Sequence, residues 1–119
     1  LRPDSETATT HALLAKTVPL FPLRLTSFGT LQYTQIAGTT QAIAIQNPDL
    51  QAADIKIRIG SDQVTFTLGP NRRIVRTLAE LFPNGFVPGP IQVGSSKPAQ
   101  MMGLQVDDVQ GSVLPVFVQ

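Results

Sequence analysis

The chain has 119 residues, of which 42% are apolar and only 14% are charged, and its formal net charge is +1. A chain of this length and apolar content can bury the core of one domain, which excludes the disordered class. The near-zero net charge supplies no long-range field, so neither nucleic acid nor an anionic membrane is an expected partner.

Cysteine is absent from the sequence, which excludes a disulfide framework, a thiolate metal site and a thiol nucleophile. The longest apolar runs are far too short to cross a bilayer, so membrane insertion is not expected. The sequence begins at Leu1 without an initiator Met or a signal peptide. We therefore expect that a targeting segment has been lost from this end.

Residues 1–22 are predicted to be a flexible linker or an edge-covering segment, and residues 23–119 are predicted to form the folded domain. The first 17 residues are rich in Thr and Ala, and Pro19 and Pro22 then exclude a helix interior or a central strand. The stretch from 18 to 28 is nevertheless apolar. We expect it to lie along a sheet edge, its own or a neighbour's, and to bury Leu20, Phe21, Leu23, Leu25 and Phe28 there.

From Leu23 onward, Gly, Pro and Asn interrupt the chain about every 8 to 12 residues, the spacing typical of a sandwich or barrel of short strands. Period-2 alternation predicts strands in five segments. These are LQYTQI (31–36), QAIAIQ (41–46), PIQV (90–93), AQMMGLQV (99–106) and SVLPVFV (112–118). In the last segment Pro115 cannot donate to a ladder, which favours an edge strand or a bulge.

The strongest local pattern is the hairpin DIKIRI–GS–DQVTFTL (54–68). Its first strand places Ile55, Ile57 and Ile59 on the inner face and Lys56 and Arg58 on the outer one. The second strand places Val64, Phe66 and Leu68 inward, with Gln63, Thr65 and Thr67 outward.

TLAELFPNG (77–85) departs from the strand period and predicts one helical turn that plugs an end of the domain. Thr77 and Glu80 have the spacing of a capping box, and Leu78, Leu81 and Phe82 share one helical face.

GSSK (94–97) places a glycine, two hydroxyls and a lysine together, which raises the possibility of a phosphate loop or an activated serine. A phosphate loop needs Lys before Ser or Thr and a helix behind it, whereas Lys97 comes last and Pro98 follows. A β-lactamase-like serine would stand three residues before the lysine, and neither Ser95 nor Ser96 does. The segment is therefore predicted to be a turn between two strands.

Other candidate chemical groups favour structural interpretations. His11 is the only histidine and lies in the predicted linker, which is a poor base for catalysis. Asp107 and Asp108 lack the further oxygen donors that Ca²⁺ needs, so a solvated turn is expected. Met102 is predicted to fill the core, and Met101 is predicted either to pack on the second face or to be exposed. No catalytic, cofactor or metal residue is identified.

Arg72, Arg73 and Arg76 form the only basic cluster and are the candidate contact for an anion or a partner. The alternative is that they form the exposed face of the strand before the helical turn, since Arg is mostly exposed whatever its role.

Three segments together resemble an Ig-like β-sandwich module common in secreted and cell-surface bacterial proteins. QAIAIQNPDLQAADIKIRI (41–59) resembles its strand, Asn-Pro turn and strand; LGPNRRIVRTLAELFP (68–83) resembles its central strand and short helix. IQVGSSKPAQMMGLQVD (91–107) resembles its closing hairpin. The resemblance covers residues 30–116 and implies a spacer or terminal domain without a catalytic residue. The family pattern has a longer hairpin loop than Gly60-Ser61.

The expected fold is thus an all-β, antiparallel Ig-like sandwich of about seven or eight short strands with one short helical turn. The expected role is a non-catalytic structural or interaction module of an exported or cell-surface protein, with other domains or proteins as partners and no cofactor. A carbohydrate- or peptide-binding module is an alternative, although the sequence has no Trp and one Tyr with which to stack a sugar. A strand-exchanging assembly subunit is another alternative, and an enzyme is disfavoured.

Overall fold

The computed structural model describes residues 24–33 and 37–119. This part of the chain is all-β and antiparallel with one short helix, as predicted. Its elements follow in order: β1 (Thr26–Leu31), β2 (Thr39–Gln46), β3 (Ala53–Ile59), β4 (Asp62–Leu68), β5 (Arg73–Thr77), α2 (Leu78–Leu81), β6 (Ile91–Asp107) and β7 (Val113–Phe117).

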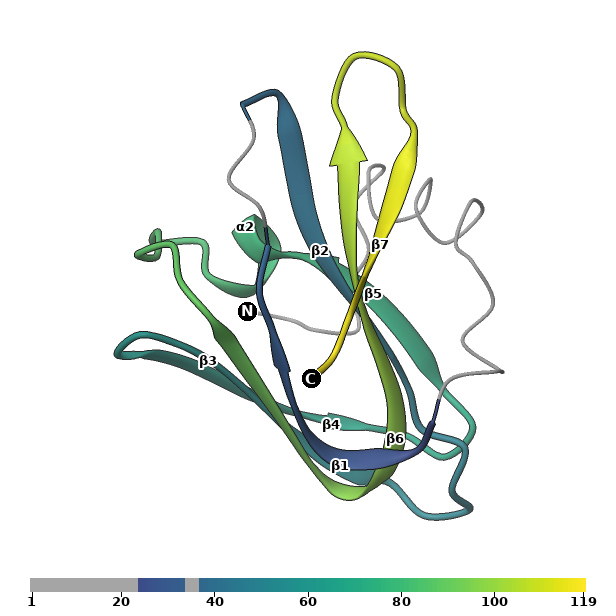
Figure 1. The fold of residues 1–119 in the computed structure, drawn as a ribbon. Helices are drawn as coiled ribbons and strands as arrows, with labels where there is room; N and C mark the ends of the chain where they lie inside the picture. Colours follow the sequence, from purple (N-terminus) through teal and green to yellow (C-terminus); the bar gives the residue numbers. More distant parts are fainter. Residues whose placement is uncertain (1–23, 34–36) are drawn as a thin grey trace.

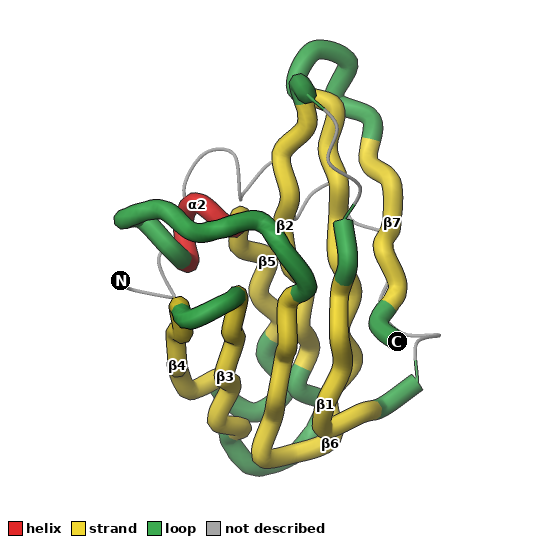
Figure 2. The backbone as a smooth tube through the Cα atoms, turned by 60° about the vertical axis from the view of Figure 1, so that its left-hand side comes forward, coloured by secondary structure: helices red, strands yellow, loops and turns green. Residues whose placement is uncertain are grey.

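The strands form one curled sheet that is organised by β6 (Figure 1). Residues 91–99 of β6 pair with β3 on one side and β1 on the other, and β3 pairs in turn with β4. Residues 100–107 pair with β2 and β7, and β2 pairs with β5. We call the sheet around the first half of β6 the first arm and the sheet around the second half the second arm. The tube view shows β6 running through both arms and bending between them (Figure 2).

The continuity of β6 corrects the prediction that PIQV and AQMMGLQV are two strands joined by a turn at GSSKP. The Ser95 hydroxyl donates to the Lys97 carbonyl at 2.6 Å and accepts from the Lys97 amide at 3.3 Å. The register against β1 also shifts between Thr26 and Phe28. A local side-chain bond and a bulge bend a strand without reversing it, so the turn-forming residues mark a corner of the sheet.

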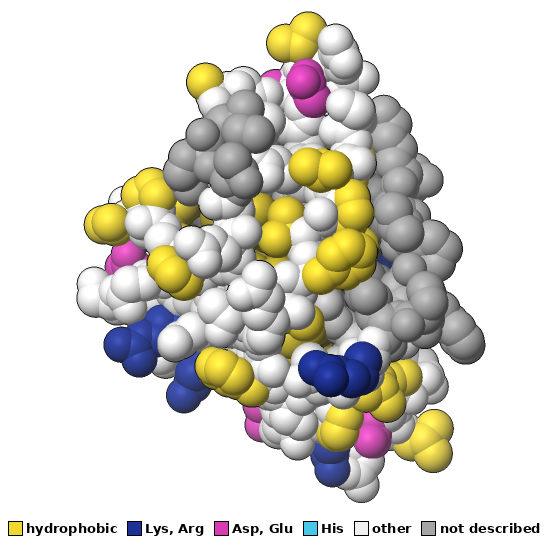
Figure 3. Space-filling model, viewed as in Figure 1, with side chains coloured by type: hydrophobic (Ala, Val, Ile, Leu, Met, Phe, Trp, Pro, Cys, Tyr) yellow, Lys and Arg dark blue, Asp and Glu magenta, His cyan; other side chains and the backbone are white. Residues whose placement is uncertain are grey.

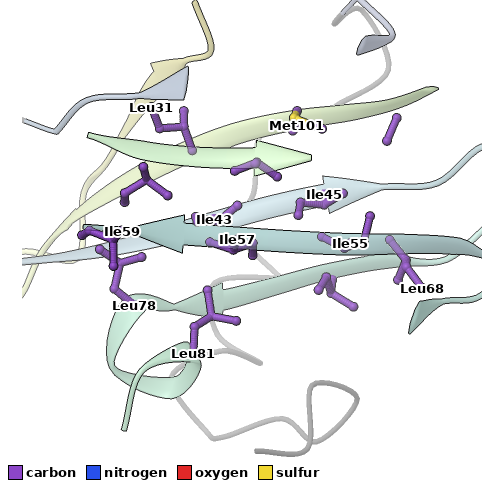
Figure 4. Packing of buried hydrophobic residues seen from close by; sticks show 14 of the residues in the cluster. Leu31, Ile43, Ile45, Ile55, Ile57, Ile59, Leu68, Leu78, Leu81 and Met101 are labelled. Carbon is purple, nitrogen blue, oxygen red and sulfur yellow. The ribbon is translucent and has the colours of Figure 1, made fainter. Parts of the chain in front are cut away.

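The main core lies between the two arms, because the curled sheet brings their inner faces together (Figure 4). The first arm contributes the isoleucines of β3, and the second contributes Ile43 and Ile45 of β2. Met101 joins this core, whereas Met102 belongs to a smaller cluster on the outer face of the second arm. Both methionines are therefore buried, on opposite faces of β6. Met102 fills a core cluster, as predicted, and Met101 packs on the second face, which was the first of its two predicted alternatives. That second face is the one turned toward the main core.

The hairpin and the helical turn agree with the sequence. β3 alternates strictly between buried and exposed side chains, and Gly60 takes the positive φ of 59° that the turn into β4 requires. Val64 and Phe66 face inward but stay half-buried, because β4 is an edge strand. At α2, Thr77 and Glu80 form the predicted capping box. The buried side chains of Leu78, Leu81 and Phe82 close one end of the core.

β1 begins and ends about five residues earlier than LQYTQI predicted, at Thr26 and Leu31. Leu31 and Tyr33 are buried on one face, as expected. Leu25 and Phe28 were expected to bury at a sheet edge and are instead half or more exposed. Residues 18–23 of that prediction lie outside the described residues.

Candidate functional site

An open trough runs across the outer face of the first arm. Three adjoining hollows of about 620, 190 and 310 Å³ make it up. The first and second hollows share Lys56 and Gly94 in their walls, and the second and third share Arg58 and Gln92. The trough therefore follows the strands rather than ending at a single pit.

The sheet register gives the order of side chains along this trough. The middle row crosses the sheet as Phe28 on β1, Gly94 on β6, Lys56 on β3 and Thr65 on β4. Two residues further along, Arg58 lies between Gln92 and Gln63. Side chains two residues apart on a strand share a face and lie roughly 6–7 Å apart, so both rows line the same surface.

Gly94 leaves a gap at the centre of the trough, because it has no side chain between its neighbours Phe28 and Lys56 in the sheet. A Cβ built at Gly94 would meet no atom within 4 Å, so the space above it is empty. Phe28 stands beside that gap with 59% of its surface exposed. The result is an exposed aromatic ring next to a hollow that is otherwise lined by polar groups.

Several polar groups in the trough are held in place by the protein. The Arg58 Nε donates to the Gly60 carbonyl at 3.0 Å, which leaves its two terminal nitrogens without a hydrogen bond to the described residues. The Thr67 hydroxyl donates to Asp54 Oδ1 at 3.2 Å, and the Asp54 amide donates to the Ser96 hydroxyl at 2.8 Å. Lys56 makes no ion pair with a carboxylate in the described part of the chain.

Basic side chains gather over the β3–β4 hairpin, at the left of the space-filling view (Figure 3). The two bases of β3, Lys56 and Arg58, are both exposed. One carboxylate, Asp54, lines the same trough. The centre of the trough is therefore cationic and its Ser96 end is polar.

The trough carries groups that can bind a polar ligand. Its walls contain hydroxyls, amides, one carboxylate and two cations, together with apolar atoms of Phe28, Ile55 and Phe66. No group of three or more His, Cys, Asp or Glu side chains that could hold a metal occurs among the described residues. Among the hydroxyls that line the trough, that of Thr67 is hydrogen-bonded to a carboxylate, Asp54 Oδ1, at 3.2 Å.

Tyr33 lies in the core with only 8% of its surface exposed. Burial raises the pKa of its phenol well above the ordinary value. The hydroxyl donates to the Ala42 carbonyl, and it also fills the space above Gly103, where a Cβ would come within 2.8 Å of the phenol oxygen. Tyr33 therefore joins β1 to the second arm as a neutral core residue.

The candidate cluster Arg72, Arg73 and Arg76 is not one site. Arg72 is exposed in the turn before β5, and Arg73 is half-buried opposite Gln46. Arg76 lies opposite Ile43, is only 2% exposed, and points to the other side of β5 from Arg73. Its Nη1 donates to the Val75 carbonyl at 2.9 Å, and its Nε has no acceptor among the described residues. The alternative prediction, that all three arginines form an exposed face of the strand, is also wrong for Arg76, because its side chain is buried.

The remaining candidates are structural where they are described. Asp107 Oδ1 accepts from the amides of Val109 and Gln110 at 2.9 and 2.8 Å, and Asp108 accepts from the Thr40 hydroxyl. These bonds hold the turn between β6 and β7 and tie it to the start of β2. His11 lies outside the described residues.

Comparison with known proteins supports the architecture alone. No family model and no curated protein matches the chain. A crystal structure titled Thermotoga maritima 1070 resembles it with a TM-score of 0.50 at 16% sequence identity, over 80% of this chain and 89% of that one. At this identity the likeness concerns the fold only. No helix in residues 24–33 or 37–119 has the length and hydropathy needed to cross a membrane.

Proposed function

We propose that the chain is a non-catalytic interaction module of an exported or cell-surface protein, and that the trough on the first arm is its binding surface. The observation that carries this proposal is the row Asp54, Lys56 and Arg58 on β3, a strand that is paired on both sides, in which hydrogen bonds hold the side chains of Asp54 and Arg58. Side chains on a rigid sheet keep their positions before a ligand arrives, which lowers the entropic cost of binding.

The immunoglobulin-like assignment and the exported location belong to the same proposal. The antiparallel all-β sheet with one capped helical turn supports the first, although the described strands form one curled sheet through β6. The sequence resemblance to modules of secreted bacterial proteins supports the second.

A binding assay combined with product analysis tests the proposal. The labelled protein is applied to arrays of glycans and peptides, in parallel with a Gly94→Leu variant that fills the trough. We expect the wild-type protein to bind a ligand saturably and the variant to lose this binding. Mass spectrometry should show that the bound ligand is recovered unchanged. Chemical conversion of the ligand would contradict the non-catalytic role, and equal binding by both proteins would place the binding surface elsewhere.

A strand-exchanging assembly subunit is the second candidate, favoured by exposed apolar side chains on an outer strand. Among the described residues, β7 pairs along its length with β6 alone, and Leu114 and Phe117 are each about three-fifths exposed. Yellow apolar side chains follow β7 in the space-filling view (Figure 3). An edge strand of this kind can pair with another chain. Light scattering over a concentration series tests it, and a monomer at every concentration would eliminate it.

A further inference from the structure

The chemistry of the trough allows its ligand to be named by class, and this inference rests on the proposed function. Lys56 and Arg58 stand two residues apart on the same face of β3, and neither forms an ion pair with a described carboxylate. Two like charges at this separation repel each other mildly. An anion placed between them would relieve that repulsion and accept charge-assisted hydrogen bonds.

The position of the trough within the sheet argues against an extended peptide as its occupant. β3 is paired with β4 and β6, and β6 is paired with β3 and β1, so the backbone groups of β3 and β6 at the centre of the trough floor are already used. A peptide that binds by adding a strand needs a free edge. Recognition in the trough must therefore come from side chains.

The side chains offered there match a sugar ring. Hydroxyl and amide groups of Thr65, Gln63 and Gln92 surround the two cations and can pair with ring hydroxyls. Phe28 presents an exposed ring beside the gap at Gly94, where the apolar face of a pyranose can lie against it. The hollows continue from one row to the next, which suits a chain of sugars better than a single one.

We propose that the trough binds an acidic polysaccharide whose sugar carboxylates lie between Lys56 and Arg58 while a neighbouring ring packs on Phe28. The Arg58 guanidinium is oriented by its Nε bond to the Gly60 carbonyl, so its terminal nitrogens can donate to a carboxylate. Asp54, held by Thr67, accepts hydrogen bonds from sugar hydroxyls at the other end.

Isothermal titration calorimetry tests the class of ligand. It compares the affinities of two oligosaccharides of equal length, an oligogalacturonate and a neutral hexose oligomer. The oligogalacturonate is expected to bind more tightly, and its affinity is expected to fall as salt rises because the contact is partly ionic. Lys56→Gln and Arg58→Gln should each weaken binding about tenfold, the scale of one charge-assisted hydrogen bond. Phe28→Ala should weaken the binding of charged and neutral chains alike.

The controls separate this inference from the function on which it rests. Arg72→Gln removes an exposed cation outside the trough and should leave the affinity unchanged. Gly94→Leu should abolish binding with an unchanged melting temperature, because its side chain enters empty space. If the neutral oligomer binds as well as the charged one, or if only a peptide binds in the trough, the acidic-polysaccharide inference is overturned and the interaction module stands. If no sugar or peptide binds the wild-type trough, both are overturned.

Discussion

Asn47 is a buried amide whose hydrogen bonds hold the β2–β3 connection to the end of β4. Its Nδ2 donates to the carbonyls of Gln51, Leu68 and Gly69 at 2.9, 3.2 and 3.2 Å. Its Oδ1 accepts from the Asp49 amide at 3.1 Å. One side chain therefore satisfies backbone groups from two separate loops. The sequence had indicated only that Asn47 and Pro48 form a turn.

Asn47→Ala is expected to lower the free energy of unfolding by roughly 2–4 kcal/mol, because buried carbonyls lose their donor. Asn47→Asp places a carboxylate against the same carbonyls, which raises the pKa of that group in the folded state. The folded variant then binds protons more readily than the unfolded one, so its stability should rise as pH falls from 7 toward 4. Urea denaturation at several pH values measures both effects. An Asn47→Asp variant that is as stable as wild type at pH 7 would contradict the role assigned to the amide.

The β3–β4 hairpin was predicted in full because its information is local. Alternation within DIKIRI assigns each side chain to a face, and the two-residue turn fixes the register. The capping box at Thr77 is equally local, since both partners lie within one turn.

Truncations on the two faces of β3 should therefore differ strongly. Ile57→Ala, at a residue only 1% exposed, is expected to cost about 2–5 kcal/mol of unfolding free energy. Lys56→Ala should change it by about 0.5 kcal/mol or less. Phe66→Ala should cost less than about 3 kcal/mol, because Phe66 is half-buried on an edge strand. Chemical denaturation of the three variants checks this order, and equal losses for Ile57→Ala and Lys56→Ala would refute the assignment of faces.

β6 could not be predicted from local signals. Gly94, the two serines and Pro98 are all residues that favour turns, and only pairing with β1, β2, β3 and β7 keeps them in one strand. The trough was missed for the same reason. The outward direction of Lys56 and Arg58 was clear from the sequence, but Gly94 had been assigned to a turn, so its position beside Lys56 in the sheet was hidden.

At the scale of the whole molecule, the outer faces of the two arms differ in kind. The first carries the polar trough, whereas the second carries a cluster of buried apolar side chains: Ala42, Ala44, Val75, Met102 and Leu104. Thr26, at the start of β1, pairs with Ala99, which precedes Met102 of this cluster along β6. The apolar stretch VPLFPL (18–23) directly precedes the start of β1 in the sequence.

Deletion of residues 1–23 is therefore expected to lower the melting temperature or to cause aggregation, since an apolar face without a partner segment associates with other chains. Light scattering and thermal melting of the truncated and full-length chains measure this. Substitution of Leu20, Phe21 and Leu23 by serine in the full-length chain serves as the matched variant and should have the same effect. A truncated chain that remains monomeric with an unchanged melting temperature would show that residues 18–23 act only as a linker.

The late position of β6 in the sequence also determines when the chain can fold during synthesis. Before Ile91 is made, only β3–β4 and β2–β5 have their partners, and these two pairs are not joined to each other. β1 must wait more than sixty residues for its partner strand. Long-range pairing of this kind slows folding and leaves strand edges uncovered until it is complete. We therefore expect a nascent chain to complete its core only after β6 has been made, and a chain that ends before Ile91 to keep β1 without its partner strand.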